Sequence, residues 1–148
     1  MILTNAKLKP VESKVNLFNR QRKLPVDLGS VRQFLESVVE CLGLNSGLSV
    51  VLVSDAAMRR YNATYAGRDR PTDVLSFPAG DTAGDEPYLG DIIISVETAD
   101  AQRSASLDDE VKVLCLHGIL HLMGYEHECD DGEMRVKEAG LRERFGLQ

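Results

Sequence analysis

The 148-residue chain has no tryptophan, a small aromatic fraction of 5%, three cysteines and three histidines. An odd number of cysteines at unrelated spacings argues against a disulfide framework and predicts a reducing compartment. No apolar run approaches the roughly 20 residues that a membrane helix needs. The first residues also lack the basic-then-apolar pattern of a secretion signal. We therefore expect a cytoplasmic protein with no membrane role.

The composition predicts one domain spanning residues 1–148, in which residues 1–13 form an extension with little pattern. The net charge of −6 argues against a protein that coats nucleic acid non-specifically. Positive charge is nevertheless clustered in two places. One cluster comprises Lys14, Arg20, Arg22 and Lys23, and the other comprises Arg59, Arg60, Arg68 and Arg70.

Hydrophobic periodicity predicts alternating strands and helices. The expected strands cover 15–20, 48–53, 72–78 and 89–96. The expected helices cover 31–42 with Ser30 as N-cap, 55–65 capped by Ser54 or Asp55, 97–105, 108–123 with a capping box from Ser106 to Asp109, and 130–144. Strands 72–78 and 89–96 are joined by a short loop, which favours an antiparallel pair, and Pro78 places the first of them near a sheet edge. The result is an α+β fold, with a two-layer mixed sheet of about four strands.

All three histidines lie in one segment, His117-Gly-Ile-Leu-His121-Leu-Met-Gly-Tyr-Glu-His127. Residues four apart on a helix share a face, so His117 and His121 can point at a common spot. Gly124 is the usual type of residue at which a helix ends and the chain reverses, which allows His127 to return as a third ligand. The helix itself is apolar nearly all round, so we expect it to be buried. This pattern predicts a metal site.

Three imidazoles suit zinc, although nickel, copper and iron are also compatible with nitrogen donors. Three protein ligands leave one tetrahedral position open, as in a catalytic site. The alternative is a closed structural site with Cys129 as the fourth ligand. Cys115 points to another side of the helix.

Two segments together resemble the signatures of the YbeY family of bacterial metal-dependent endoribonucleases, namely Pro71-Thr-Asp-Val-Leu-Ser-Phe-Pro78 and the histidine segment. Similar patterns occur at Asn19-Arg-Gln21, at Leu89-Gly-Asp-Ile92 and over Asp131, Met134, Glu138 and Leu141. The resemblance spans about 15–148. It implies one Zn²⁺ held by His117, His121 and His127, and cleavage of single-stranded ribosomal RNA. It also implies a role in 3′-end maturation of small-subunit RNA and in ribosome quality control, with the small ribosomal subunit as partner and no DNA.

Two positions depart from the family pattern. Ala66 stands where the family often has an arginine thought to contact RNA phosphate, and Arg68 or Arg70 is the candidate replacement. Glu126 stands where an aspartate is usual before the third histidine. The candidate catalytic residues are therefore Glu126, Arg68, Arg70 and Asp73. An arginine beside the metal would stabilise negative charge that grows on phosphate oxygens, whereas Glu126 or Asp73 would act as base or orient a histidine.

Two other functions remain open. The histidine spacing is shared with metzincin proteases, whose second motif position is a glutamate acting as general base. That position is Gly118 here, so a metallopeptidase-like hydrolase would lack its base at the expected place. The other alternative is a non-catalytic ribosome-assembly factor with a structural metal.

Overall fold

A computed structural model of the chain describes residues 14–80, 87–125 and 132–147. Its strands are β1 (Val15–Asn19), β2 (Gly47–Val53), β3 (Val74–Pro78) and β4 (Tyr88–Ser95). Its helices are α2 (Leu28–Cys41), α3 (Asp55–Ala66), α4 (Val96–Gln102), α5 (Leu107–Leu122) and α6 (Glu133–Arg144).

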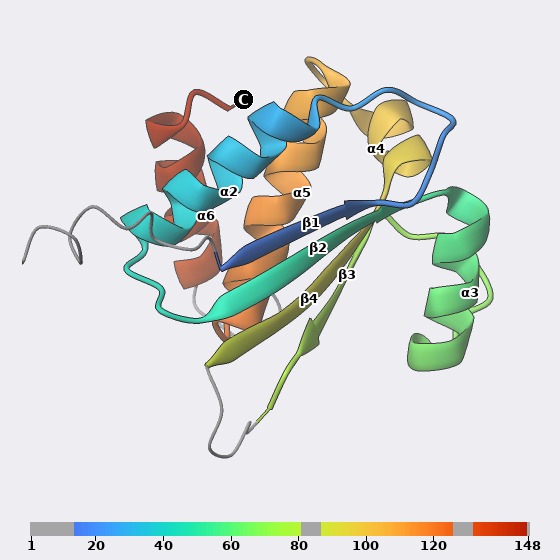
Figure 1. The fold of residues 1–148 in the computed structure, drawn as a ribbon, viewed down its shortest axis with the longest axis horizontal. Coiled ribbons are helices and arrows are strands. Elements are labelled where there is room, and N and C mark those ends of the chain that lie inside the picture. The colour runs from blue at the N-terminus through green and yellow to red at the C-terminus, as the bar shows by residue number, and fades with distance from the viewer. Residues whose placement is uncertain (1–13, 81–86, 126–131, 148) are drawn as a thin grey trace, which may run out of the picture.

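The four strands form one mixed sheet in the order β1-β2-β4-β3. β1, β2 and β4 are parallel, whereas β3 runs antiparallel to β4 and forms one edge of the sheet. The predicted α+β class, the antiparallel pair and the edge position of the strand that ends in Pro78 are all confirmed. Figure 1 shows α2, α4, α5 and α6 on one side of the sheet and α3 on the other.

The larger core lies between the sheet and the first group of helices. Alternate residues of β2 and β4 face this side and are fully buried, including Leu52, Ile92 and Ile94. α5 packs against them with most of its surface buried, as its apolar sequence predicts. A second, smaller core under α3 contains Val53, Met58 and Ile93.

The start of α2 differs from the prediction, which placed the N-cap at Ser30. The helix begins at Leu28, and the carboxylate of Asp27 is the cap, because its Oδ1 accepts from the backbone N–H of Ser30 at 3.1 Å. Asp27 and Ser30 are both good capping residues, but Asp27 has the extended backbone of an N-cap and Ser30 lies in the first turn of the helix.

Two other boundaries also differ. α4 ends at Gln102 instead of continuing to residue 105, because the backbone is already extended at Arg103 and again at Ser106, the N-cap of α5. α6 begins at Glu133, after Gly132, which adopts a positive φ of 97° that a helix cannot contain. The predicted N-caps Ser54 and Ser106 are confirmed, since each accepts a hydrogen bond from the backbone three residues later.

None of the helices within the described ranges is long and apolar enough to cross a membrane.

Candidate metal centre and its surroundings

The centre of the site is a pair of imidazole rings on the last two turns of α5. Nε2 of His117 lies 3.0 Å from Nε2 of His121, and the ring centroids are 4.5 Å apart at an interplanar angle of 78°. Zinc–nitrogen bonds of roughly 2.0–2.1 Å at a tetrahedral angle hold two nitrogens about 3.3 Å apart. The donor atoms of the pair are therefore positioned much as two ligands of one metal ion would be.

These rings are more exposed than the helix that carries them. Gly118, Ile119 and Leu120 between them are buried, whereas both histidines are half-buried and the His117 side chain is 25% exposed. The expectation of a buried helix is confirmed, but its histidines open to the outside. A substrate can therefore approach them without displacing the core.

A glutamate on α6 fixes the orientation of one ring. Oε1 of Glu138 lies 3.2 Å from Nδ1 of His117, and both side chains are partly buried. When Nδ1 donates its proton to this carboxylate, the lone pair of the ring resides on Nε2, the atom that faces His121. Such a carboxylate–histidine pair is the usual outer support of a histidine metal ligand.

The histidines open into a hollow of about 390 Å³ between α5 and the sheet edge. Its other wall is the edge strand β3 with the residue before it, and the lining comprises Asp73, Val74, Leu75, Ser76, Pro78, His117 and His121. Residues 73–78 and the histidines of α5 therefore line opposite sides of one cleft, although the two segments are about 40 residues apart in the chain.

Asp73 is the candidate catalytic residue that reaches this hollow. Its Oδ1 accepts from the N–H of Val74 at 2.8 Å, and its Oδ2 accepts from Nε2 of Gln102 at 3.1 Å. Its backbone carbonyl accepts from the N–H of Ser95 at 2.9 Å. The carboxylate is therefore held in place by its own strand and by α4.

The two candidate arginines lie elsewhere. Arg68 and Arg70 are exposed in the loop after α3, and neither is among the residues that line the hollow. Asn62 holds this loop with two hydrogen bonds. Its side-chain Nδ2 donates to the backbone carbonyl of Arg70 at 2.8 Å, and its backbone carbonyl accepts from the N–H of Arg68 at 3.2 Å. Ala66, the departure from the family pattern, is the last residue of α3.

Gly118 has no room for a side chain. A Cβ at this position would lie 2.8 Å from Cγ2 of Ile92, a fully buried residue in the middle of β4. The position at which a metzincin protease carries its glutamate is therefore in direct contact with the sheet.

The helix ends as its glycine predicts. Gly124 has a φ of 99°, and the N–H of Tyr125 donates to the carbonyl of Leu120 at 3.0 Å, which reverses the chain. Glu126, His127 and Cys129 come after this turn, outside the described residues.

The described ranges contain no group of three or more His, Cys, Asp or Glu side chains that could hold a metal ion. The pair that they do contain fits zinc by its donor type, by the spacing of its nitrogens and by the carboxylate behind His117. Cys115 takes no part, because it is fully buried in the core, and burial raises the pKa of its thiol to about 12.

Comparison with known proteins identifies the family. A sequence profile described as Endoribonuclease YbeY matches residues 16–146. This chain belongs to the YbeY family of endoribonucleases. A YbeY endoribonuclease of Aquifex aeolicus is 42% identical over 124 residues, which cover 81% of each chain. One from Geobacter sulfurreducens is 41% identical over 142 residues, covering 90% of this chain and 95% of the relative.

A solved structure supports the same fold for this YbeY chain. The solution structure of a Thermotoga maritima protein matches it with a TM-score of 0.62 and 28% identity, covering 89% of both chains.

The contact from Glu138 to His117 is the feature of the site that sequence reasoning missed. A signal for it does exist. Glu138 follows Met134 by four residues and precedes Leu141 by three, and both neighbours are buried. A carboxylate at that spacing lies on the inward face of the helix, where a charged group needs a partner.

Proposed function

We propose that this protein is a zinc-dependent endoribonuclease that cuts single-stranded RNA in the 3′-end maturation of small-subunit ribosomal RNA and in ribosome quality control. The observation that carries the proposal is the pair of Nε2 atoms, 3.0 Å apart, facing an open hollow in a chain of the YbeY family. The compartment that follows from this role is the cytoplasm, and the partners are ribosomal RNA and the small ribosomal subunit.

His117 and His121 would hold the metal, with His127 as the third ligand. A zinc ion there would supply Lewis acidity toward a phosphoryl oxygen. The protein's own contribution is to orient the ligands: Glu138 fixes the tautomer of His117, and the helix fixes the spacing of the two rings.

The remaining residues position the RNA. β3 forms the wall opposite the histidines, so a phosphodiester in the hollow lies between the strand and the rings. Asp73 lines the same hollow, and its carboxylate is held by hydrogen bonds from Val74 and Gln102. It is placed to accept a proton or a hydroxyl hydrogen bond from the substrate. Arg68 or Arg70 would neutralise phosphate charge along the strand outside the hollow, since both lie on the exposed loop that leads into β3.

The contact between Gly118 and Ile92 disfavours the peptidase alternative, because a glutamate base cannot be accommodated there. Peptide cleavage would need a base from another element.

The decisive experiment compares cleavage of a short single-stranded RNA with cleavage of casein, each with and without a chelator. We expect RNA cleavage that stops on chelation and returns with zinc, and no proteolysis. His117→Ala and His121→Ala should abolish cleavage and zinc binding, whereas Glu143→Ala, an exposed residue of α6, should retain both. A His117→Ala variant that cleaves RNA at the wild-type rate would remove the mechanism.

The same experiment tests the non-catalytic alternative. If chelation lowers thermal stability and ribosome association but no RNA is ever cut, the metal is structural and the protein is an assembly factor.

A further inference from the structure

The side of the sheet that faces away from the histidines carries a second hollow region. α3 covers only part of this side, and two hollows of about 440 and 470 Å³ adjoin it. Both are lined by Arg20, Tyr61 and Tyr65, so they are parts of one groove between the strands and α3. We call it the α3 groove, and its chemistry is set by Phe18, Arg20, Arg60, Tyr61, Tyr65 and Phe77.

Aromatic rings are concentrated in this groove. The chain has four Phe and four Tyr, and four of these eight residues line it. Tyr65 stands 5.4 Å from Phe77 and 6.3 Å from Tyr61 between ring centroids. Tyr65 is 66% exposed and Phe18 is 45% exposed, which is far more than folding requires of such large rings. Flat apolar faces are thus presented to solvent.

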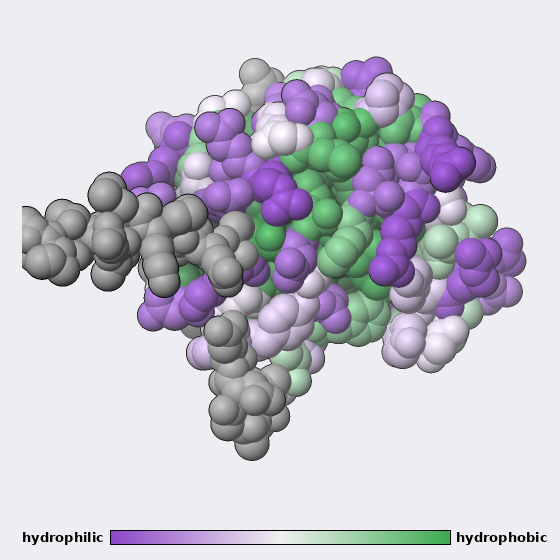
Figure 2. Space-filling model, in the orientation of Figure 1, coloured by the Kyte–Doolittle hydropathy of each residue, from purple (hydrophilic) through white to green (hydrophobic). Residues whose placement is uncertain are grey.

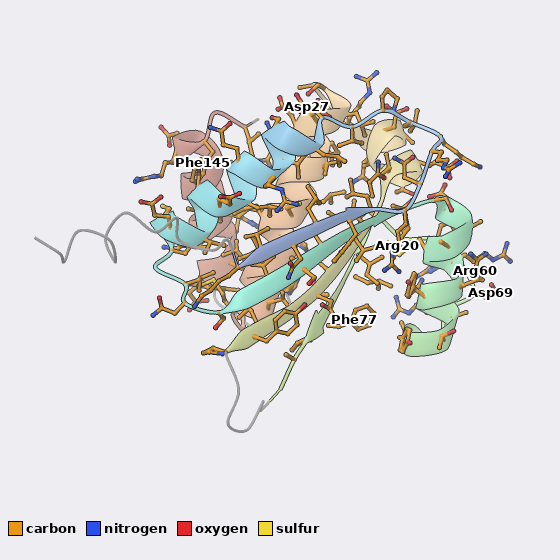
Figure 3. The ribbon with its side chains drawn as sticks, viewed as in Figure 1. Arg20, Asp27, Arg60, Asp69, Phe77 and Phe145 are labelled. Carbon is orange, nitrogen blue, oxygen red and sulfur yellow. The ribbon has the colours of Figure 1, made fainter. Side chains whose placement is uncertain are left out.

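Two cationic side chains border these rings. The guanidinium of Arg20 lies 5.8 Å from the ring centroid of Phe18, and Arg60 lines the groove from α3. In the described part of the chain, neither guanidinium is paired with a carboxylate, in contrast to the Arg59–Asp69 pair at 2.7 Å. Figure 2 shows this part of the surface, where hydrophobic residues are interrupted by hydrophilic ones. In Figure 3, Arg20 and Phe77 point into the space between the strands and α3.

One carboxylate, that of Asp91, lies on the floor of the groove. It accepts a hydrogen bond from the hydroxyl of Tyr88, which also contacts Ser49. Asp91 brings one negative charge to the groove, whereas Arg20 and Arg60 bring two positive charges, so the balance of charge favours an anionic ligand.

We propose that the α3 groove binds unpaired nucleotides of a single-stranded RNA, with bases stacked on Phe18, Tyr65 and Phe77 and phosphates on Arg20 and Arg60. This inference rests on the proposed function and adds a binding site to it. Exposed aromatic faces beside arginines are the combination that holds single-stranded nucleic acid without reading its sequence. A base can stack on a side chain only when it has left its duplex, so the groove selects unpaired RNA.

The edge strand β3 connects the groove to the histidines. Ser76 and Pro78 line the hollow that contains His117, whereas Phe77 between them lines the groove on the other side. β3 is five residues long, and no other strand of the described ranges pairs with its outer side. One RNA strand can therefore pass around this edge, with some nucleotides in the groove and the scissile phosphate beside the histidines.

The first test measures binding without catalysis. A fluorescent single-stranded oligouridine of eight nucleotides is titrated with chelator-treated protein and followed by anisotropy. We expect Phe18→Ala and Tyr65→Ala each to weaken binding by about five-fold to a hundred-fold, since each removes a stacking surface. Val136→Ala truncates an apolar residue on α6 that is even more exposed, at 74%, and should leave the affinity unchanged. Circular dichroism checks that every variant is folded.

The second test measures the salt dependence of the same binding. Each phosphate contact to a single strand contributes about 0.7 to the slope of log affinity against log salt. Arg20→Gln and Arg60→Gln should each make that slope shallower by about this amount. Arg144→Gln removes the same charge at the end of α6 and should not change the slope.

Photo-crosslinking locates the RNA directly. An oligonucleotide that carries 4-thiouridine is irradiated with the protein, which is then digested with trypsin. The adducts should appear on peptide 15–20, which contains Phe18, on peptide 61–68, which contains Tyr61 and Tyr65, and at Phe77 within peptide 69–103.

The outcomes separate this inference from the proposed function. If RNA is cleaved but the groove variants bind the oligonucleotide as wild type does, the groove proposal is overturned and the nuclease stands. If nothing is cleaved but binding still depends on Phe18 and Tyr65, the groove proposal stands and the nuclease fails. Equal affinity for duplex and single-stranded RNA would also overturn it, as would crosslinks that avoid Phe18, Tyr61, Tyr65 and Phe77.

Discussion

Gly118 of α5 packs against Ile92 of β4 so closely that an added methyl group would lie 2.8 Å from Cγ2 of Ile92. We predict that Gly118→Ala lowers the free energy of unfolding by up to about 2 kcal/mol. Overpacking costs about 1–3 kcal/mol and is only partly offset by the helix preference of alanine, about 1 kcal/mol. Urea denaturation measures the difference.

The matched control is Gly140→Ala on α6, where an added Cβ meets nothing within 4 Å. This variant should be more stable than wild type by up to about 1 kcal/mol. Equal effects of the two substitutions would show that helix preference, and not the contact with Ile92, governs position 118.

Glu138 is predicted to strengthen metal binding without being a ligand. Glu138→Ala should reduce zinc affinity by about 10–100-fold, the usual effect of removing a carboxylate that supports a ligating histidine. Competition with a chromophoric chelator measures the affinity. Glu143→Ala, on the exposed part of the same helix, should bind zinc as wild type does. A Glu138→Ala variant with unchanged zinc affinity would mean that the hydrogen bond to His117 serves only the fold.

The capping of α2 gives a direct comparison between neighbouring residues. Asp27→Ala should lower the free energy of unfolding by about 0.5–2 kcal/mol, because the N–H of Ser30 loses its acceptor. Ser30→Ala should change it little, since this residue lies within the first turn. Thermal or chemical denaturation of both variants decides the point, and a larger loss for Ser30→Ala would contradict the assignment.

The buried thiol of Cys115 should make the free energy of unfolding depend on pH in the alkaline range. Burial raises the pKa of its thiol from 9.0 to about 12. Between these values the unfolded chain releases a proton that the folded chain keeps, so the free energy of unfolding falls as pH rises through this window. The contribution of one such group has a maximum slope of about 1.4 kcal/mol per pH unit.

Cys115→Ala should remove this contribution and flatten the pH dependence, although it lowers stability at neutral pH by leaving a cavity. In the native protein, iodoacetamide at pH 8 should modify the exposed Cys41 and leave Cys115 unmodified until the protein unfolds. Fast native modification of Cys115, located by fragmentation of its peptide, would contradict this.

Local periodicity was sufficient to predict most elements and the approach of His117 to His121. His117 and His121 meet because a four-residue spacing on a helix brings side chains together whatever the fold. The continuous apolar run of β2 likewise indicates a buried strand, and most of its residues are buried or half-buried. By contrast, the insertion of β4 between β2 and β3 depends on pairings that no local pattern encodes.

The features that sequence reasoning missed depend on contacts between distant segments. Glu138 reaches His117 across 21 residues. Asp27, the true cap of α2, is also bound through its N–H to Asp108, 81 residues away. The α3 groove draws its rings from β1, α3 and β3, so its aromatic residues appear scattered along the sequence.

The edge position of β3 also bears on how the protein avoids self-association. The backbone carbonyl of Asp73 accepts from the N–H of Ser95, and the N–H of Ala79 donates to the carbonyl of Leu89, so both residues face β4. Because backbone groups alternate along a strand, those of Val74, Ser76 and Pro78 face away from β4. The N–H of Val74 is taken by the carboxylate of Asp73, and Pro78 has no N–H to offer. If a strand of a second molecule paired with the outer side of β3, only the backbone N–H of Ser76 would be available on β3 as a donor to it. The outer edge of β3 is therefore accessible to a substrate but is a poor template for strand pairing between molecules, and hence for aggregation.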